Sequence, residues 1–128
     1  MTTYAGSIDM TEAGIGVKFS AVVGSSGVTA GYPVVWDGSH ANTVIASTTS
    51  GDVVVGIARD TVSSGGTVTV LGPGCAVLTP FTLTVGGKVG CGVTGTAGQL
   101  VNWTAGTVVG TVDTSGALAS IVRVSIQY

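Results

Sequence analysis

The chain has very few charged residues for its length. Its 128 residues include four lysines and arginines and six aspartates and glutamates, or 8% of the total, whereas about a quarter of an average soluble domain is charged. Apolar residues make up 45%. Because a free surface is seldom so poor in charge, we expect other protein to cover much of it, either neighbours in an assembly or copies of the same chain. The alternative is a neutral surface of serine, threonine, glycine and backbone.

The sequence also lacks segments that would take it into a membrane. Its apolar runs, such as residues 53–58, are much shorter than the roughly 18 residues that a spanning helix needs. The first six residues lack the basic stretch and apolar core of a signal peptide. We therefore expect no membrane partner and a product that is made and kept in the cytoplasm.

Positive charge is too sparse for nucleic acid binding. The formal net charge is −2 at pH 7, and the basic residues are scattered, so they form no stripe that would neutralise phosphates. These residues are Lys18, Arg59, Lys88 and Arg123. We expect no nucleic acid partner.

Metal ligands are equally scarce. One histidine and two cysteines without a CxxC spacing do not complete a typical zinc ligand set, so we expect no metal and no cofactor. Cys75 and Cys91 could form a disulfide if their strands lie side by side. In a reducing cytosol, two buried free thiols are the favoured interpretation.

No catalytic constellation is evident, although catalysis needs titratable groups gathered in a cleft. Asp37, Ser39 and His40 are close in sequence, but neighbours in one tight turn rarely form a triad, so we interpret them as a polar turn. The other carboxylates are dispersed and mostly lie beside turn residues. We expect a protein that is not an enzyme; the alternative is a hydrolase whose site is assembled from those carboxylates.

Glycine, valine and threonine dominate the composition, and they favour strands and tight turns over helices. The odd-numbered residues of 17–23 are apolar, and in residues 67–70 valines alternate with threonines. From Val122 to Tyr128 the even-numbered residues are apolar. Such period-two patterns predict antiparallel strands over a core.

Turn residues separate the runs at roughly the 8–12-residue spacing that is typical of sandwiches and barrels. We therefore predict an all-β fold, a small barrel or sandwich of about nine or ten short antiparallel strands in a single domain over residues 17–128. Pro33 is expected at the start of a strand or on an edge strand.

Residues 1–16 differ from the rest, because Asp9, Glu12 and three glycines break any strand pattern. They are either a frayed terminus or an extended N-terminal arm that becomes ordered on a partner. The apolar residues through which such an arm could dock are Tyr4, Ile8, Met10 and Ile15.

A weak internal duplication is visible. Residues 29–34 resemble 84–89, residues 54–61 resemble 108–114, and residues 68–70 resemble 122–124. A recurring offset of about 54 residues favours a genuine repeat, with two similar β units over about residues 29–70 and 84–126. The alternative is chance similarity in a chain rich in glycine, valine and threonine.

Three further side chains are candidate contacts with partners. Trp36 and Trp103 have large areas to bury in a core or an interface; alternatively, they form a platform on which a sugar stacks. Arg59, followed by Asp60, is expected at the end of a strand, where it could pair across a subunit boundary.

Several of these segments are similar to a known family. GVTAGYPVV at 27–35, VGIA at 55–58 and GTVTV at 66–70 resemble the capsid decoration (cement) proteins of tailed bacteriophages. TVGGKVG at 84–90 and VVGT at 108–111 are similar too, so the likeness covers about residues 17–126.

The resemblance implies a compact β-barrel or β-tulip-like domain without catalytic residues or cofactors. It implies a homotrimer at local three-fold positions on the outer surface of the phage head, assembled in the host cytoplasm, which staples neighbouring subunits of the major capsid protein. The N-terminal arm would make part of the capsid contact. The alternative function is a carbohydrate-binding or adhesive β module of a phage virion.

Overall fold

The computed structural model describes residues 16–47, 54–91, 99–103, 108–116 and 119–127, with the backbone alone for residues 91, 126 and 127. This part of the chain contains ten strands and no helix, so the predicted all-β fold is confirmed. The strands are β1 (Lys18–Val23), β2 (Pro33–Trp36), β3 (Thr43–Ala46), β4 (Val54–Ala58), β5 (Thr67–Leu71), β6 (Ala76–Thr79), β7 (Lys88–Cys91), β8 (Leu100–Asn102), β9 (Val108–Ser115) and β10 (Ser120–Gln127).

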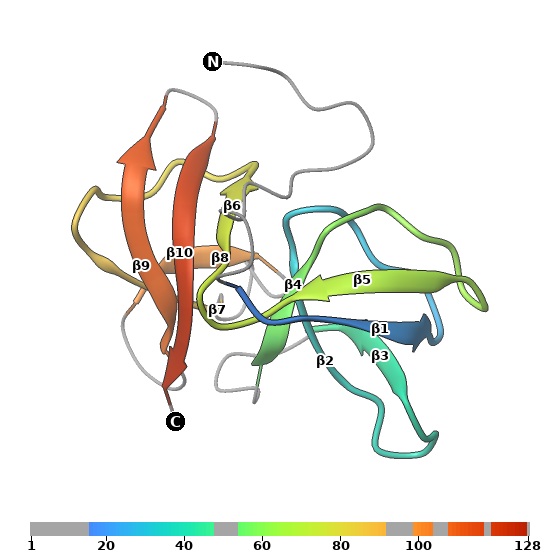
Figure 1. The fold of residues 1–128 in the computed structure, drawn as a ribbon. Coiled ribbons are helices and arrows are strands. Elements are labelled where there is room, and N and C mark those ends of the chain that lie inside the picture. The colour runs from blue at the N-terminus through green and yellow to red at the C-terminus, as the bar shows by residue number, and fades with distance from the viewer. Residues whose placement is uncertain (1–15, 48–53, 92–98, 104–107, 117–118, 128) are drawn as a thin grey trace.

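The first five strands form a closed barrel (Figure 1), in the order β1-β3-β2-β4-β5. β1 and β3 run parallel, with Val22 opposite Thr43 and Val23 opposite Val44, whereas the other pairs of the barrel are antiparallel. The expectation of antiparallel strands throughout is therefore wrong for this pair. Side chains alternate between two faces in both kinds of pairing, so the sequence pattern could not distinguish them.

The last five strands form a second sheet beside the barrel (Figure 1), which we call the open sheet. Its order is β6-β10-β9-β7-β8, and all its pairs are antiparallel. β6 and β8 are its two edges.

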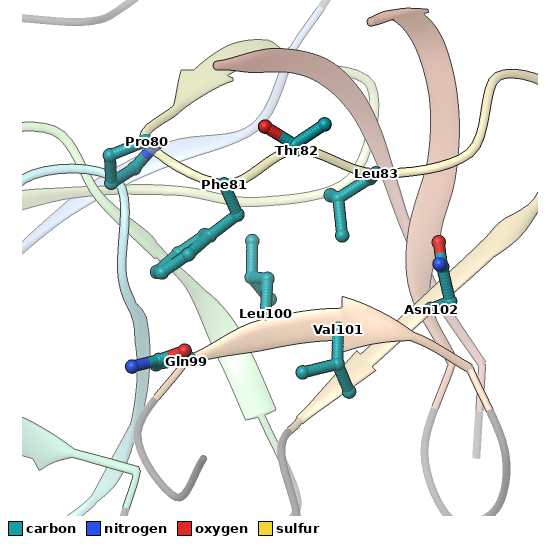
Figure 2. A pocket seen from close by; sticks show the side chains of 8 residues that line it. All are labelled: Pro80, Phe81, Thr82, Leu83, Gln99, Leu100, Val101 and Asn102. Atoms are coloured by element: carbon teal, nitrogen blue, oxygen red, sulfur yellow. The ribbon is translucent and has the colours of Figure 1, made fainter. Parts of the chain in front are cut away.

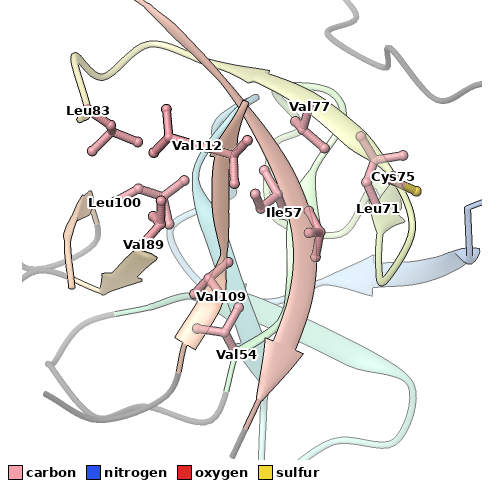
Figure 3. Close-up of a cluster of buried hydrophobic side chains, with 12 residues drawn as sticks. Val54, Ile57, Leu71, Cys75, Val77, Leu83, Val89, Leu100, Val109 and Val112 are labelled. Carbon is pink, nitrogen blue, oxygen red and sulfur yellow. The ribbon is translucent and has the colours of Figure 1, made fainter. Parts of the chain in front are cut away.

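Two clusters of buried apolar side chains hold the fold together. One fills the barrel and includes Val34, Val44 and Val70. The other lies between the barrel and the open sheet; Figure 3 shows Ile57 and Leu71, which come from barrel strands, among the side chains of the open sheet. The outer wall of the barrel thus covers one face of the open sheet.

The barrel and the open sheet share one scheme of strand pairing. Within each set of five, taken in chain order, the first strand pairs with the fifth, the second with the third and the fourth, and the fourth with the fifth. The β1–β3 pair, which closes the barrel, has no counterpart in the described part of the open sheet.

The residue register is the same as well. Val34 of β2 lies opposite Gly56 of β4, and Val89 of β7 lies opposite Gly110 of β9. Both glycines are buried. The two sets of strands can therefore be aligned residue by residue.

The alignment extends to the fourth and fifth strands. Ile57 lies opposite Leu71 in the barrel, and Thr111 lies opposite Arg123 in the open sheet. Since Ile57 and Thr111 each follow the buried glycine directly, Leu71 and Arg123 occupy corresponding positions.

A glycine turn precedes the second strand of each set. Gly31 and Gly86 have φ angles of 85° and 78°, in the left-handed region that side chains with a Cβ atom disfavour. The N–H of Gly31 donates to the carbonyl of Ala58 and that of Gly86 to the carbonyl of Val112, each at 2.9 Å. The predicted sequence duplication stays a prediction, because an equal topology does not require a common sequence ancestor.

The predicted alternation is present where side chains are described. Val68 and Val70 of β5 and Val122 and Val124 of β10 are buried, and the polar residues next to them in β10 are exposed. Val17 differs from the expected pattern: it precedes β1 and is 54% exposed.

Strand β2 begins at Pro33 and lies between β3 and β4. Of the two predicted alternatives, the start of a strand is therefore correct. Cys75 is a buried free thiol whose Sγ donates to the carbonyl of Val17 at 3.4 Å, which agrees with the thiol interpretation. The side chain of Cys91 lies outside the described part.

Candidate functional site

One exposed aromatic side chain lies at the end of β2. Trp36 is 48% exposed and stacks on Phe19 of β1, with ring centroids 5.5 Å apart and planes at 29°. Val22, also on β1, is 40% exposed. A tryptophan that is held by a neighbouring ring and still open to solvent suits contact with an apolar partner surface.

A second exposed aromatic side chain follows β8. Trp103 is 38% exposed, and the Nζ atom of Lys88 lies 5.2 Å from its ring centroid, the geometry of a cation–π contact. Trp36 and Trp103 lie on different sheets, and each has its own partner. Their predicted part in partner binding stays a prediction.

Arg59 pairs with its neighbour in the same chain. Its Nε atom lies 3.0 Å from Oδ2 of Asp60, and the two side chains are 34% and 25% exposed. Pairs of this kind contribute roughly 0–1 kcal/mol. The predicted pairing of Arg59 across a subunit boundary stays a prediction.

The Asp37–His40 segment forms a hydrogen-bonded turn. Oδ1 of Asp37 accepts the backbone N–H of Ser39 at 2.9 Å, and Oδ2 lies 2.8 Å from Nδ1 of His40. The Ser39 N–H, followed by the bond to His40, lowers the pKa of Asp37. Ser39 contributes its backbone here, so these contacts are those of a turn. A hollow of about 340 Å³ lies beside it.

A second hollow, of about 370 Å³, lies between residues 80–83, which follow β6, and strand β8. Figure 2 shows Phe81, Leu83 and Leu100 pointing into it and Val101 pointing away. None of the lining residues is charged, and Thr82, Gln99 and Asn102 are polar, so the hollow offers apolar, hydroxyl and amide contacts and no general acid or base. We call it the seam.

The sequence pattern did not predict the seam. The signal that could have indicated it is Pro80, which directly follows the apolar run of β6 and cannot donate a ladder hydrogen bond. The consequence of that proline depends on which strand would have been its neighbour, and the sequence pattern does not contain that information.

The remaining expectations from the sequence concern metal ions, membranes and the N-terminal arm. Within the described ranges, no group of three or more His, Cys, Asp or Glu residues could hold a metal ion, and no helix is long and apolar enough to cross a membrane. The arm residues Tyr4, Ile8, Met10 and Ile15 lie outside the described residues, so their predicted contacts stay predictions.

The fold is similar to that of a solved structure, whereas the sequence has no recognised relatives among family models or curated proteins. No protein-family model matches the chain, and no curated protein sequence does. A solved structure with a similar fold is the N base of the head fiber gp8.5 of bacteriophage phi29, with a TM-score of 0.58 and 18% sequence identity. The match covers 89% of this chain and 100% of that chain. At this identity the likeness concerns the fold.

Proposed function

We propose that this chain is a structural protein of a bacteriophage virion, a decoration protein on the outer surface of the head. The observation that carries the proposal is the fold shared with a phage head fiber base over 89% of this chain. The resemblance of residues 27–35 and 66–70 to capsid decoration proteins supports the same role. The proposal includes no catalytic function.

In this proposal a homotrimer, assembled in the host cytoplasm, staples neighbouring subunits of the major capsid protein. A protein that binds only the assembled shell stabilises that shell in proportion to its occupancy. Individual contacts can be weak, because a trimer binds through several of them at once and gains avidity.

Apolar and backbone contacts would carry this binding. Only four lysines and arginines occur in the whole chain, and the exposed Trp36 and Trp103 provide area for apolar contact. Salt screens charge pairs over a Debye length of about 8 Å at physiological strength and about 3 Å at 1 M, but it does not weaken apolar contacts. Binding is therefore expected to persist at high salt.

The test compares heads with and without this protein under heat, a chelator and osmotic shock. Purified protein is then added back to undecorated heads at increasing salt concentrations. Decorated heads should survive conditions that break undecorated ones. Equal survival would refute the reinforcing role, and loss of binding at moderate salt would refute the apolar contact.

A substitution maps the contact. Trp36→Ser should lower the occupancy of heads at a given protein concentration, whereas Ser125→Ala, on an exposed position of β10, should not. Melting curves of both variants separate a lost contact from a lost fold, because Trp36 also packs on Phe19.

The second candidate is a carbohydrate-binding or adhesive module of a virion. The exposure of Trp36 and Trp103 favours it, since aromatic faces stack on sugars. Titration with a panel of glycans, followed by tryptophan fluorescence, tests it. Saturable binding that Trp36→Ser or Trp103→Ser abolishes would replace the decoration role, and a flat response across the panel would remove this candidate.

A further inference from the structure

The hollow beside the Asp37–His40 turn lies at the end of the barrel where β1 stops. Its wall comes from three segments: residues 22–25, the turn between β2 and β3, and residues 64–65, which precede β5. The end of β1 and the start of β5 lie side by side here (Figure 1), with Val22 opposite Thr67. We call this space the turn hollow. Its volume of about 340 Å³ is near the lower end of the range for small-molecule sites, which suits a single small ring.

Backbone hydrogen bonds hold the three wall segments in place. The N–H of Val23 donates to the carbonyl of Gly66, and the N–H of Gly65 donates to the carbonyl of Val23, each at 2.8 Å. On the other side, the N–H of Val22 donates to the carbonyl of Asn42 at 2.9 Å. The wall is therefore formed before a ligand arrives, so binding there orders few additional groups.

Asp37 supplies an ionised acceptor to the turn hollow. A Cβ atom on Gly24 would lie 3.4 Å from its Oδ2 atom, so the carboxylate reaches from the β2–β3 turn to the wall that follows β1. The Ser39 N–H and the His40 ring each contact one of its oxygens, whereas a carboxylate has about four acceptor sites. The lowered pKa of Asp37 keeps it ionised at neutral pH. The carboxylate can therefore accept further hydrogen bonds from a ligand.

The other lining residues offer hydroxyl groups and apolar surface. Ser25 and Ser64 line the turn hollow, and a serine hydroxyl both donates and accepts hydrogen bonds. Val22 also lines it and is 40% exposed. A few placed polar groups beside an apolar surface are typical of small-molecule sites.

The charges of the lining residues restrict the class of ligand. They include no lysine or arginine, so an anion such as phosphate would meet the Asp37 carboxylate with no such cation to pair with it. Asp37 is the only carboxylate among them, and no group of three or more His, Cys, Asp or Glu residues in the described ranges could hold a metal ion. The lining therefore favours a neutral ligand that has both hydroxyl groups and a C–H surface.

We propose that the turn hollow binds a neutral sugar ring. Ring hydroxyl groups donate to Asp37 and exchange hydrogen bonds with Ser25 and Ser64, while the C–H face of the ring lies on Val22. The proposal does not depend on the proposed decoration role. It also differs from sugar stacking on the exposed tryptophans, because neither Trp36 nor Trp103 lines the turn hollow.

Titration of the full-length protein with glucose, galactose and N-acetylglucosamine, each alone, tests the proposal. In amide-resolved NMR spectra, at least one of these sugars should give saturable shifts at Ser25, Ser64 and Gly65. Asp37→Asn should weaken that binding about tenfold, because it replaces a charged acceptor. Ser64→Ala should weaken it about threefold, since it removes one neutral hydrogen-bonding group.

Two matched controls should bind as wild type does. Ser39→Ala changes a serine of the same turn that contacts Asp37 through its backbone N–H, which alanine retains. Asp113→Asn removes an exposed carboxylate from the open sheet. Circular dichroism of every variant shows whether the fold is retained, and the Ser64→Ala measurement tests the site independently of the Asp37 turn.

Three results would overturn the proposal. The first is the absence of saturable shifts with all three sugars, and the second is binding that Asp37→Asn and Ser64→Ala leave unchanged. The third is binding that only Trp36→Ser or Trp103→Ser abolishes, which would place the sugar on a tryptophan face instead. Survival of decorated and undecorated heads is a separate measurement, so failure of the decoration role and failure of the sugar site are distinguishable.

Discussion

The barrel and the open sheet use the same strand pairings, but their outward faces differ. Ile57 and Leu71, which lie opposite each other on the barrel wall, are fully buried. Their counterparts Thr111 and Arg123 are exposed. The reason is that the open sheet packs on the barrel wall, whereas nothing in the described chain covers the other face of the open sheet. Burial at a strand position is thus set by what packs there, and not by its place in the topology.

The barrel closes and the open sheet does not, for a related reason. The barrel completes its hydrogen bonding through the β1–β3 pair. The open sheet has the barrel wall against one face, so its apolar side chains are buried without closure. One pairing scheme therefore yields a closed unit and a unit that depends on its neighbour.

The largest expected effect comes from exchanging residues between corresponding positions of the two outward faces. Leu71→Arg places a charge at a fully buried position, where an uncompensated charge costs about 3–5 kcal/mol. Arg123→Leu loses only an exposed ion pair with Asp113, with N and O atoms 3.3 Å apart, which amounts to about 1 kcal/mol or less. Chemical denaturation followed by circular dichroism measures both. Similar losses in the two variants would contradict the asymmetry.

The next effect tests whether the open sheet is as tightly packed as the barrel. A Cβ atom at Gly56 would lie 2.6 Å from the carbonyl oxygen of Leu71, and one at Gly110 would overlap the carbonyl oxygen of Arg123. Because these two carbonyl oxygens belong to the backbone of a paired strand and cannot swing aside as a side chain can, Gly56→Ala and Gly110→Ala should each cost about 1–3 kcal/mol.

The matched control is Gly38→Ala, since a Cβ atom there meets no other atom within 4 Å. It should change the free energy of unfolding by less than about 0.5 kcal/mol. If Gly110→Ala were as stable as this control while Gly56→Ala was not, the strands of the open sheet would be able to move apart to admit a Cβ atom, and those of the closed barrel would not.

Much of the fold could be predicted from local patterns, because alternation and turn residues report on single strands. The run Val54–Ala58 shows where this information ends. β4 is buried on both faces apart from Val55, so its apolar run signals burial without identifying what covers it. The parallel β1–β3 pair and the packing of the two sheets depend on residues that are far apart in the sequence. They do not change the two-residue alternation of apolar and polar residues within a strand.

The candidate contact residues were predictable only as residue types. Trp36 was singled out by its size, and its exposure follows from its place at the end of β2, against Phe19. The seam was not predictable, since it needs both Pro80 and the knowledge that β8 is its neighbour. The arm residues lie outside the described chain, and their role stays a prediction.

A smaller effect tests the two glycine turns. An alanine in the left-handed region costs about 1–2 kcal/mol, so Gly31→Ala and Gly86→Ala should lose similar amounts of stability. Asparagine tolerates this region better, so Gly31→Asn and Gly86→Asn should lose less. Thermal melting ranks the four variants. A large penalty at Gly31 with none at Gly86 would mean that the two turns are not equivalent.

The smallest effect concerns pH and the turn at the end of β2. The Ser39 N–H and then His40 lower the pKa of Asp37 below the ordinary value of 3.8. The folded chain therefore binds the Asp37 proton less readily than the unfolded chain, so this interaction stabilises the fold above the unfolded pKa and is lost as the pH falls through the folded one. Asp37→Asn removes the titration, and the stability of wild type relative to this variant should shrink as the pH falls from about 5 to about 2. The change should be small because the carboxylate is close to solvent. A difference that grew in wild type's favour on acidification would mean that the pKa of Asp37 is raised, and the hydrogen bonds assigned to this turn would then be wrong.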